Sequence, residues 1–183
     1  MNLKKLFDMQ RVLDQRILEK HPELKGQNNL NWKVLALQVE LGECANEHRG
    51  FKKWSNNQEP RIRAVKAPAM MEEDKEYYNP LLEEYVDCLH FILSIGIELG
   101  ITDIELWWLQ VPDATSCFLK CFENINSLYL VFCVNGQVTQ NLYEQLFGNF
   151  IMLGKSIGFT EEQIESAYFE KNAINHQRQE QGY

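Results

Sequence analysis

Apolar residues recur along most of this chain at intervals of three and four, the spacing of one face of an α-helix. The stripe in residues 2–20 ends at His21-Pro22, and the Pro, Gly and Asn content of residues 21–29 predicts a loop. We predict further helices over 30–49, 79–100, 103–110, 113–134, 139–158 and 160–183.

Two of these predicted helices have clear end markers. Asn79 followed by Pro80 predicts a helix start, and Gly100 predicts its end. Thr160 followed by Gln163 forms a capping box.

Strand patterns are weak in this chain. Only LYLVFCV (128–134) has enough β-branched and aromatic residues to keep a strand as an alternative to a helix. We therefore predict an all-α helical bundle and a single domain over residues 1–183. Residues 51–79 are expected to form a long connecting loop with at most short helices.

Composition narrows the class of protein. A chain of 183 residues with 45% hydrophobic and 24% charged residues is an ordinary globular protein that can bury a core. Its net charge of −8 argues against direct binding to nucleic acid. Five cysteines in no compact spacing favour buried free thiols in a reducing cytoplasm. The N-terminus lacks the apolar run of a signal peptide, and residues 88–99 are too short to span a bilayer, so we expect no membrane association.

Two pairs of carboxylates lie on two of the predicted helices. Glu40 and Glu43 are three residues apart, as are Glu84 and Asp87, so each pair projects from one side of its helix. Ionised carboxylates that face a protein interior need compensation, and a hard cation such as Mg²⁺ supplies it. We therefore predict a Mg²⁺ site formed by four carboxylates on two adjacent helices.

Other interpretations of these acids stay open. The acids of 30–49 lie roughly 90° from the apolar stripe of their helix, which also fits a water-facing edge. On 79–100 the acids continue through Ser94 and Glu98 as a narrow polar stripe on an otherwise apolar helix, which favours an inward-facing site. A di-iron site requires a Glu-x-x-His motif on two helices. His90 is the single nearby imidazole, and we expect a buried, hydrogen-bonded histidine there.

The last predicted helix becomes polar and basic toward its end. One face begins with Ile164 and Tyr168 and continues as Lys171, Asn175 and Arg178. Such a face is typical of a helix whose far end reaches a polar site, where Lys and Arg can hold phosphate oxygens. A solvated terminal helix fits the spacing equally well.

Three further side chains are candidates for a pocket that binds a nucleotide base. Trp54, in GFKKWSNN, can stack on a base, although a packing role also fits. Gln10 and Asp14, four residues apart on the first helix, can form a hydrogen-bonding edge, although each alone would pass as a surface residue.

Taken in order, the segments ELGE, KKWSNN, LLEEYVDCLHFILSIG and AYFEKNAINHQRQEQGY resemble the dimeric all-α dUTPases of bacteria, phages and trypanosomatids. The resemblance spans most of the chain. Its carboxylate pattern is shared with the MazG-like nucleotide pyrophosphohydrolases, whereas the C-terminal run and the Trp54 segment favour dUTPase. The first helix departs from the family pattern, which has Gln followed four residues later by Asn, because this chain has Asp14.

The resemblance implies hydrolysis of dUTP to dUMP and pyrophosphate, with Mg²⁺ orienting the triphosphate and activating a water molecule. It implies Mg²⁺ ligation by Glu40, Glu43, Glu84 and Asp87, with Glu40 as general base and Glu43 as the fallback. The implied phosphate contacts are Lys171, Asn172, Asn175 and Arg178. The implied uracil contacts are Gln10, Asp14 and Trp54.

Two rival functions remain. One is a pyrophosphohydrolase of another nucleotide, such as dCTP, dUDP or a modified nucleotide. The other is a non-catalytic helical interaction protein, which is disfavoured because all four acids and the basic face occur together. The many apolar residues in 88–99 and 117–134 also predict a homodimer.

Overall fold

The computed structural model of the chain describes residues 1–67, 71–106 and 112–182, and it confirms the all-α class with six α-helices in this part. Of the helix predicted over 103–110, residues 103–106 are not helical, and the remainder lies outside the described residues. The helices are α1 (Leu3–Lys20), α2 (Leu30–His48), α3 (Pro80–Leu99), α4 (Ala114–Asn135), α5 (Gln140–Ser156) and α6 (Glu161–Gln181).

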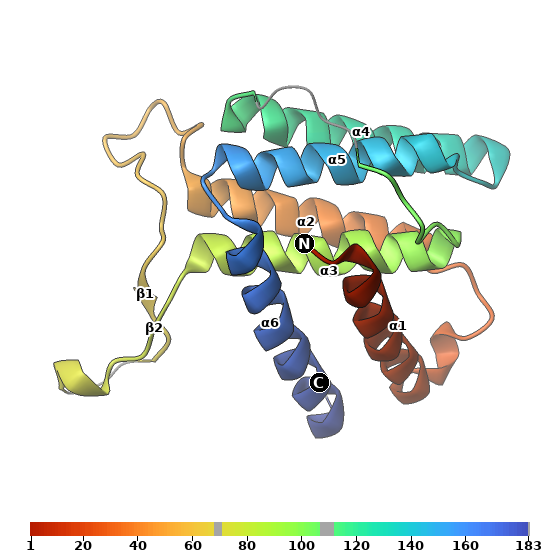
Figure 1. Cartoon of the computed structure of the whole chain (residues 1–183), viewed down its shortest axis with the longest axis horizontal. Helices are drawn as coiled ribbons and strands as arrows, with labels where there is room; N and C mark the ends of the chain where they lie inside the picture. Colours follow the sequence, from red (N-terminus) through yellow and green to blue (C-terminus); the bar gives the residue numbers. More distant parts are fainter. Residues whose placement is uncertain (68–70, 107–111, 183) are drawn as a thin grey trace.

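Four of the helices form a bundle and two cross it. Helices α2, α3, α4 and α5 lie with their axes roughly aligned, while α1 and α6 descend steeply from α3 (Figure 1). The most extensive packing joins α2 to α3, and these two helices run antiparallel. The middle of α2 therefore lies beside the first half of α3, and the start of α2 lies beside the end of α3.

The predicted helix ends are present. The Asn79 side chain accepts a hydrogen bond from the backbone N–H of Leu82, and Gly100 ends α3 in the left-handed conformation with φ of 72°. Thr160 and Gln163 form the capping box that begins α6. Residues 128–134 belong to α4 and form no strand, because α4 buries residues at helical spacing against its neighbours.

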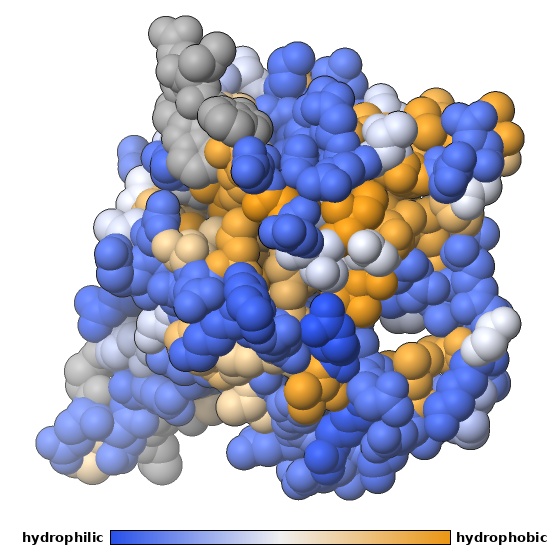
Figure 2. Space-filling view, turned by 45° about the vertical axis from the view of Figure 1, so that its right-hand side comes forward, coloured by the Kyte–Doolittle hydropathy of each residue, from blue (hydrophilic) through white to orange (hydrophobic). Residues whose placement is uncertain are grey.

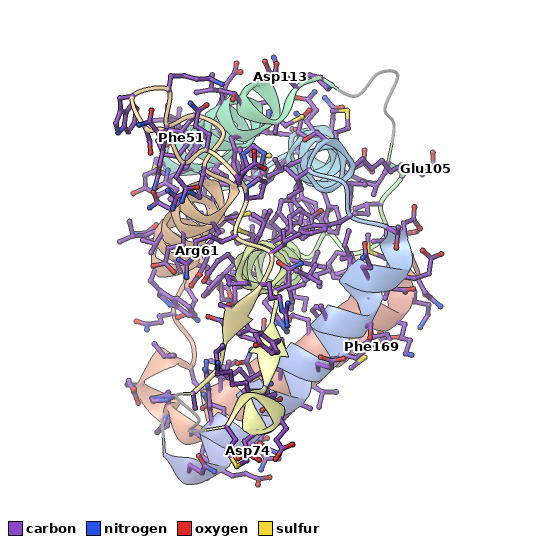
Figure 3. All side chains as sticks on the ribbon, turned by 90° about the vertical axis from the view of Figure 1, so that its left-hand side faces the viewer. Phe51, Arg61, Asp74, Glu105, Asp113 and Phe169 are labelled. Atoms are coloured by element: carbon purple, nitrogen blue, oxygen red, sulfur yellow. The ribbon has the colours of Figure 1, made fainter. Side chains whose placement is uncertain are left out.

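The connection between α2 and α3 contains little regular structure, as predicted. It includes a 3₁₀ turn (Glu72–Asp74) and two very short strands, β1 (Ala64–Val65) and β2 (Tyr77–Tyr78), which pair antiparallel. These strands were not predicted, because two residues are too few to show a period of two. The part of this connection that contains β1 and β2 extends below the bundle, with Asp74 near its far end (Figure 3). A second 3₁₀ turn, η1 (Pro22–Leu24), follows α1.

Two buried tyrosines tie α3 to α5. The ring of Tyr85 stacks on Phe150, with centroids 4.3 Å apart, and its hydroxyl donates to the Phe150 carbonyl at 3.0 Å. The hydroxyl of Tyr143 donates to the Ile92 carbonyl at 2.8 Å. Each buried hydroxyl is thereby satisfied, so both rings contribute their apolar area to the core without a desolvation penalty.

One helix of the described part, α4, is long and apolar enough to cross a membrane by length and composition alone. Only 28% of its most apolar window is buried. Because α4 packs against α5 and α2, it belongs to the bundle and leaves an apolar outer face.

Candidate metal and nucleotide site

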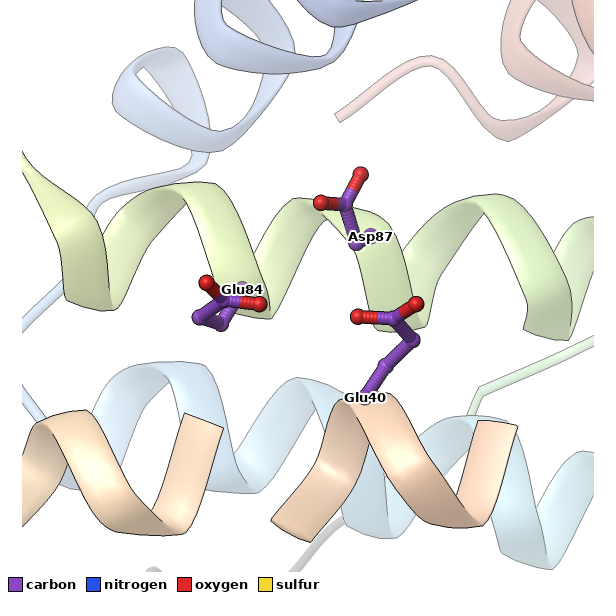
Figure 4. Close-up of side chains that lie close together, drawn as sticks. All are labelled: Glu40, Glu84 and Asp87. Carbon is purple, nitrogen blue, oxygen red and sulfur yellow. The ribbon is translucent and has the colours of Figure 1, made fainter. Parts of the chain in front are cut away.

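Three of the four predicted metal ligands meet between α2 and α3. Glu40, Glu84 and Asp87 each offer a carboxylate oxygen, and these oxygens all lie within 4.8 Å of one another (Figure 4). The antiparallel packing of α2 on α3 produces this meeting, because it sets Glu40 opposite the acids of α3. Glu43, one turn further along α2, is exposed and lies outside this group of three.

The carboxylates of the group hold protons unusually tightly. Burial, followed by the charges of Asp87 and Glu43, raises the pKa of Glu40 to about 7. Burial and the neighbouring acids raise the pKa of Glu84 to about 8. Burial also raises the pKa of Asp87, against the opposing charge of Lys171. When all three carboxylates are ionised, the group therefore has more negative charge than its surroundings neutralise.

Lys171 partly compensates this charge. Lys171 is 8% exposed, and its ammonium lies 2.6 Å from Asp87 Oδ2 and 2.8 Å from Glu83 Oε1. We predicted a phosphate contact for Lys171; in this structure it pairs with a predicted metal ligand. Glu83 was not predicted, because a glutamate in the first turn of a helix is unremarkable in a sequence.

A cavity of about 460 Å³ opens beside the carboxylates, within the range of small-molecule sites. Glu40 and Asp87 form part of its wall, so the candidate metal site faces the cavity. Helices α1, α2, α3 and α6 all contribute to its lining. The predicted substrate residues that line it are Gln10, Asp14, Asn175 and Arg178.

Besides Lys171, two predicted substrate residues, Trp54 and Asn172, do not line this cavity. Trp54 is 78% exposed and contacts Phe51 edge-on, at a centroid separation of 5.7 Å. Asn172 is buried, and its Nδ2 has no hydrogen-bond partner among the described residues. The roles predicted for these two side chains remain predictions.

Gln10 is held in one orientation by two buried aromatic groups. Its Oε1 lies 2.8 Å from Nδ1 of His90 and accepts from the Tyr168 hydroxyl at 2.9 Å. Burial lowers the pKa of His90 to about 3, so the ring is neutral. Because an amide oxygen only accepts, Nδ1 carries the proton of this ring. Gln10 Nε2 is consequently directed to Asp14, whose Oδ1 it meets at 2.7 Å.

Sequence reasoning missed Lys33, which also lines the cavity and is 6% exposed. Lys33 lies within the apolar stripe of α2, three residues after Leu30 and four before Leu37. A lysine inside an apolar stripe is a detectable signal, because a buried ammonium needs a specific partner. In this structure the partner is Glu98, at 2.7 Å.

The three clustered carboxylates fit a hard divalent cation. They are oxygen ligands in an under-neutralised, half-buried setting, which is the chemistry that Mg²⁺ prefers. Within the described residues, the group contains no histidine or thiol that would favour iron or zinc.

We expect the metal-free protein to lose stability as the pH rises from 6.5 to about 8.5. Folded Glu40 and Glu84 retain protons at pH values where the unfolded chain has lost them, so the folded state binds more protons and stability falls with rising pH. His90, whose folded pKa is lowered, contributes in the opposite direction, and this contribution fades as the unfolded imidazole loses its remaining proton above its ordinary value of 6.5. Melting temperatures in EDTA should therefore fall across this window.

Mg²⁺ provides the control for this pH series. Mg²⁺ binds the ionised carboxylates and favours proton release. At a saturating concentration, the melting temperature should therefore stay constant or rise with pH. In EDTA, the melting temperature of the variant Glu84→Gln should fall less steeply with pH than that of the wild-type protein. A melting temperature in EDTA that is constant or rises between pH 6.5 and 8.5 would contradict the electrostatic account of the cluster.

The chain is similar to a known protein family. A family model described as dUTPase matches residues 2–68 and 71–183, almost the whole chain. A comparison with curated proteins gives no match.

Proposed function

Because this chain belongs to the dUTPase family, whose activity is that of a dUTP diphosphatase, we propose that its carboxylate cluster cleaves dUTP to dUMP and pyrophosphate with Mg²⁺. We propose as metal ligands Glu40, Glu43, Glu84 and Asp87. The observation that carries this proposal is the position of the cluster, because Glu40 and Asp87 line the same cavity as Gln10 and Asp14, two of the three predicted base-binding residues.

The proposed reaction uses both a bound cation and side chains of the cluster. Bound Mg²⁺ would supply Lewis-acid activation of a water molecule and neutralise the triphosphate. Glu40 is proposed to accept the proton of the attacking water, because it lies on the cavity wall and its raised pKa marks it as a competent base. Glu43, whose charge already acts on Glu40, is the fallback base.

Basic and amide groups of α6 are proposed to hold the phosphates. Asn175 and Arg178 line the cavity, and Arg178 also acts on Asp87 through its charge. Lys171 would exchange its contacts with Glu83 and Asp87 for phosphate oxygens once a cation neutralises Asp87. Asn172 is a further proposed phosphate contact.

The base would occupy the part of the cavity between α1 and α3. Gln10 and Asp14 present amide and carboxylate groups there and are proposed to bind the uracil edge. Trp54 is proposed to stack on the base, which requires the segment after α2 to approach the cavity, since Trp54 is exposed in this structure. Discrimination against thymine is proposed to be steric, through a clash with the 5-methyl group.

A nucleotide panel tests this proposal. With Mg²⁺ we expect pyrophosphate release from dUTP in preference to dCTP, dUDP and dTTP, and EDTA should stop the reaction. Preferred cleavage of dCTP or dUDP would point to the rival nucleotide pyrophosphohydrolase. Failure to bind dUTP or Mg²⁺ at all would favour the interaction protein.

We also propose that the protein is a homodimer that pairs through the outer face of α4. Leu119, Leu130 and Val134 lie on one side of this helix and are 66%, 62% and 82% exposed. Hydrophobic surface is visible in the upper part of the molecule, where α4 and α5 lie (Figure 2). Large exposed apolar residues gathered on one side of a helix are typical of an interaction surface.

Sedimentation at micromolar concentration should show a dimer, because burying the α4 face removes apolar area from water. The variant Leu130→Glu should shift the protein toward monomer, whereas Lys120→Glu on the same helix should not. A monomeric wild-type protein would contradict the proposed assembly.

We further propose a single domain over residues 1–183. We also propose a cytoplasmic location, and the buried free thiols support this location.

A further inference from the structure

Lys33 of α2 is a buried cation in the wall of the cavity that Asn175 and Arg178 of α6 also line. Its Nζ donates to Glu98 Oε2 at 2.7 Å and lies 3.5 Å from the Ser94 carbonyl oxygen. The second Glu98 oxygen accepts from the backbone N–H of Asn29 at 2.9 Å. These contacts fix the ammonium at one point of the wall.

Asp14 faces the same ammonium from α1. Its Oδ2 lies 3.8 Å from Lys33 Nζ and accepts from the Ser94 hydroxyl at 2.7 Å, while its Oδ1 accepts from Gln10. An ammonium has three donor hydrogens and a carboxylate about four acceptor positions. The contacts with Glu98 and Ser94 use two of the Lys33 hydrogens, and those with Ser94 and Gln10 use two acceptor positions of Asp14. Both groups therefore keep capacity for a ligand.

This pair matches the hydrogen-bonding edge of uracil. Uracil presents a donor, N3–H, next to an acceptor, O4. Asp14 can accept from N3–H while Lys33 donates to O4. Cytosine presents the reverse pattern, with an acceptor at N3 and an amino donor at C4. Its amino group would face an ammonium that cannot accept a hydrogen bond, and its N3 would face a carboxylate.

We infer that Lys33 is a specificity-determining residue. It donates a hydrogen bond to the O4 carbonyl of uracil, while Asp14 accepts from N3–H, and this pair therefore disfavours the binding of cytosine. This inference rests on the proposed function, because it requires the base to bind between α1 and α3. A base contact of this kind is made in the ground state and the transition state alike, so its loss raises KM more than it lowers kcat.

A purely structural role for Lys33 is the competing explanation. Its ion pair with Glu98 joins the start of α2 to the end of α3, and losing one partner would leave a buried charge unpaired. A test therefore needs a variant in which Glu98 is not left as an unpaired charge. The double variant Lys33→Met with Glu98→Gln removes both charges of this ion pair while keeping similar side-chain volumes, and Asp14 keeps its hydrogen bonds from Ser94 and Gln10.

The experiment measures kcat and KM of the wild-type protein, Lys33→Met and the double variant with dUTP, dCTP and dTTP in Mg²⁺. We expect the ratio of kcat/KM for dUTP to that for dCTP to fall by roughly 10- to 100-fold in both variants, as expected for a lost charged hydrogen bond. The change should lie mainly in KM. The ratio of dUTP to dTTP should stay constant, because thymine has the same N3–H and O4 as uracil.

The possible failures are distinguishable. If the wild-type protein releases no pyrophosphate from dUTP, the proposed function fails. If the wild-type protein cleaves dUTP but either variant keeps the wild-type dUTP to dCTP ratio, the function stands and the inference is overturned. A wild-type protein with no preference for dUTP over dCTP overturns it as well, as does an equal loss of activity toward all three nucleotides.

Discussion

Replacing Asp87 with Asn should abolish Mg²⁺-dependent release of pyrophosphate from dUTP, and Glu40→Gln should do the same. Each substitution removes a charged oxygen ligand from the group of three at the α2–α3 contact. Metal-assisted charge stabilisation contributes several kcal/mol to such reactions, so we expect kcat to fall by roughly 10³-fold or more. The measurement is steady-state pyrophosphate release, with far-ultraviolet circular dichroism to follow helicity.

Both variants should keep their helical content, because they replace a carboxylate by an amide of nearly the same shape. The matched control is Glu123→Gln, an equal change of charge on the exposed surface of α4, which should keep wild-type kcat. Near-normal turnover in Asp87→Asn or Glu40→Gln would remove the metal assignment. Loss of helicity in parallel with activity would mean that the variant reports on folding instead.

The second large effect concerns stability, at Gly96 in α3. A Cβ at this position would lie 2.6 Å from Cζ of Tyr143 and 2.9 Å from the backbone carbonyl oxygen of Ile101. Tyr143 is fully buried and its hydroxyl is bound to Ile92, so the ring has no room to retreat. We expect Gly96→Ala to lower the free energy of unfolding by about 1–3 kcal/mol through overpacking. Denaturant unfolding followed by circular dichroism measures it.

Gly42→Ala is the matched control, because Gly42 also lies inside a helix but a Cβ there would meet nothing within 4 Å. It should raise the free energy of unfolding by roughly 0.5–1 kcal/mol, the usual gain of Ala over Gly in a helix. If Gly96→Ala proves as stable as the wild-type protein, Tyr143 does not pack on α3 as described. Equal destabilisation by both variants would point to a general effect of substitution in these helices.

The helices were predictable because local rules and tertiary packing agree in this chain. The caps Asn79 and Thr160 and the stop at Gly100 are short-range chemistry, and the structure has all three. The segment at 128–134 shows where propensity alone misleads, since its β-branched and aromatic residues form part of α4. Spacing over a whole helix was the better guide there, because burial depends on the face that a residue occupies.

The candidate site was predictable to the extent that it depends on helical spacing. Acids three residues apart on two neighbouring helices indicated a convergent cluster, and Glu40, Glu84 and Asp87 do converge. Glu43 does not join them in this structure, because a turn of helix carries it toward solvent. Its assignment as a ligand stays a prediction, as does the relation to the MazG-like enzymes.

Other features of the site depend on contacts between segments far apart in the sequence. The pairing of Lys171 with Glu83 and that of Lys33 with Glu98 each join residues more than sixty positions apart. No spacing rule along one helix can indicate such a pair. The placement of Trp54 is likewise outside the reach of periodicity, because it follows α2 in a connection with little regular structure.

A crystal structure of the protein with Mn²⁺ and a non-hydrolysable dUTP analogue would test the central claim most directly, with Mn²⁺ located by its anomalous scattering. We predict metal bound to the oxygens of Glu40, Glu84 and Asp87, with the triphosphate beside it and the uracil ring between α1 and α3. Metal bound elsewhere, or a nucleotide outside this cavity, would contradict the account.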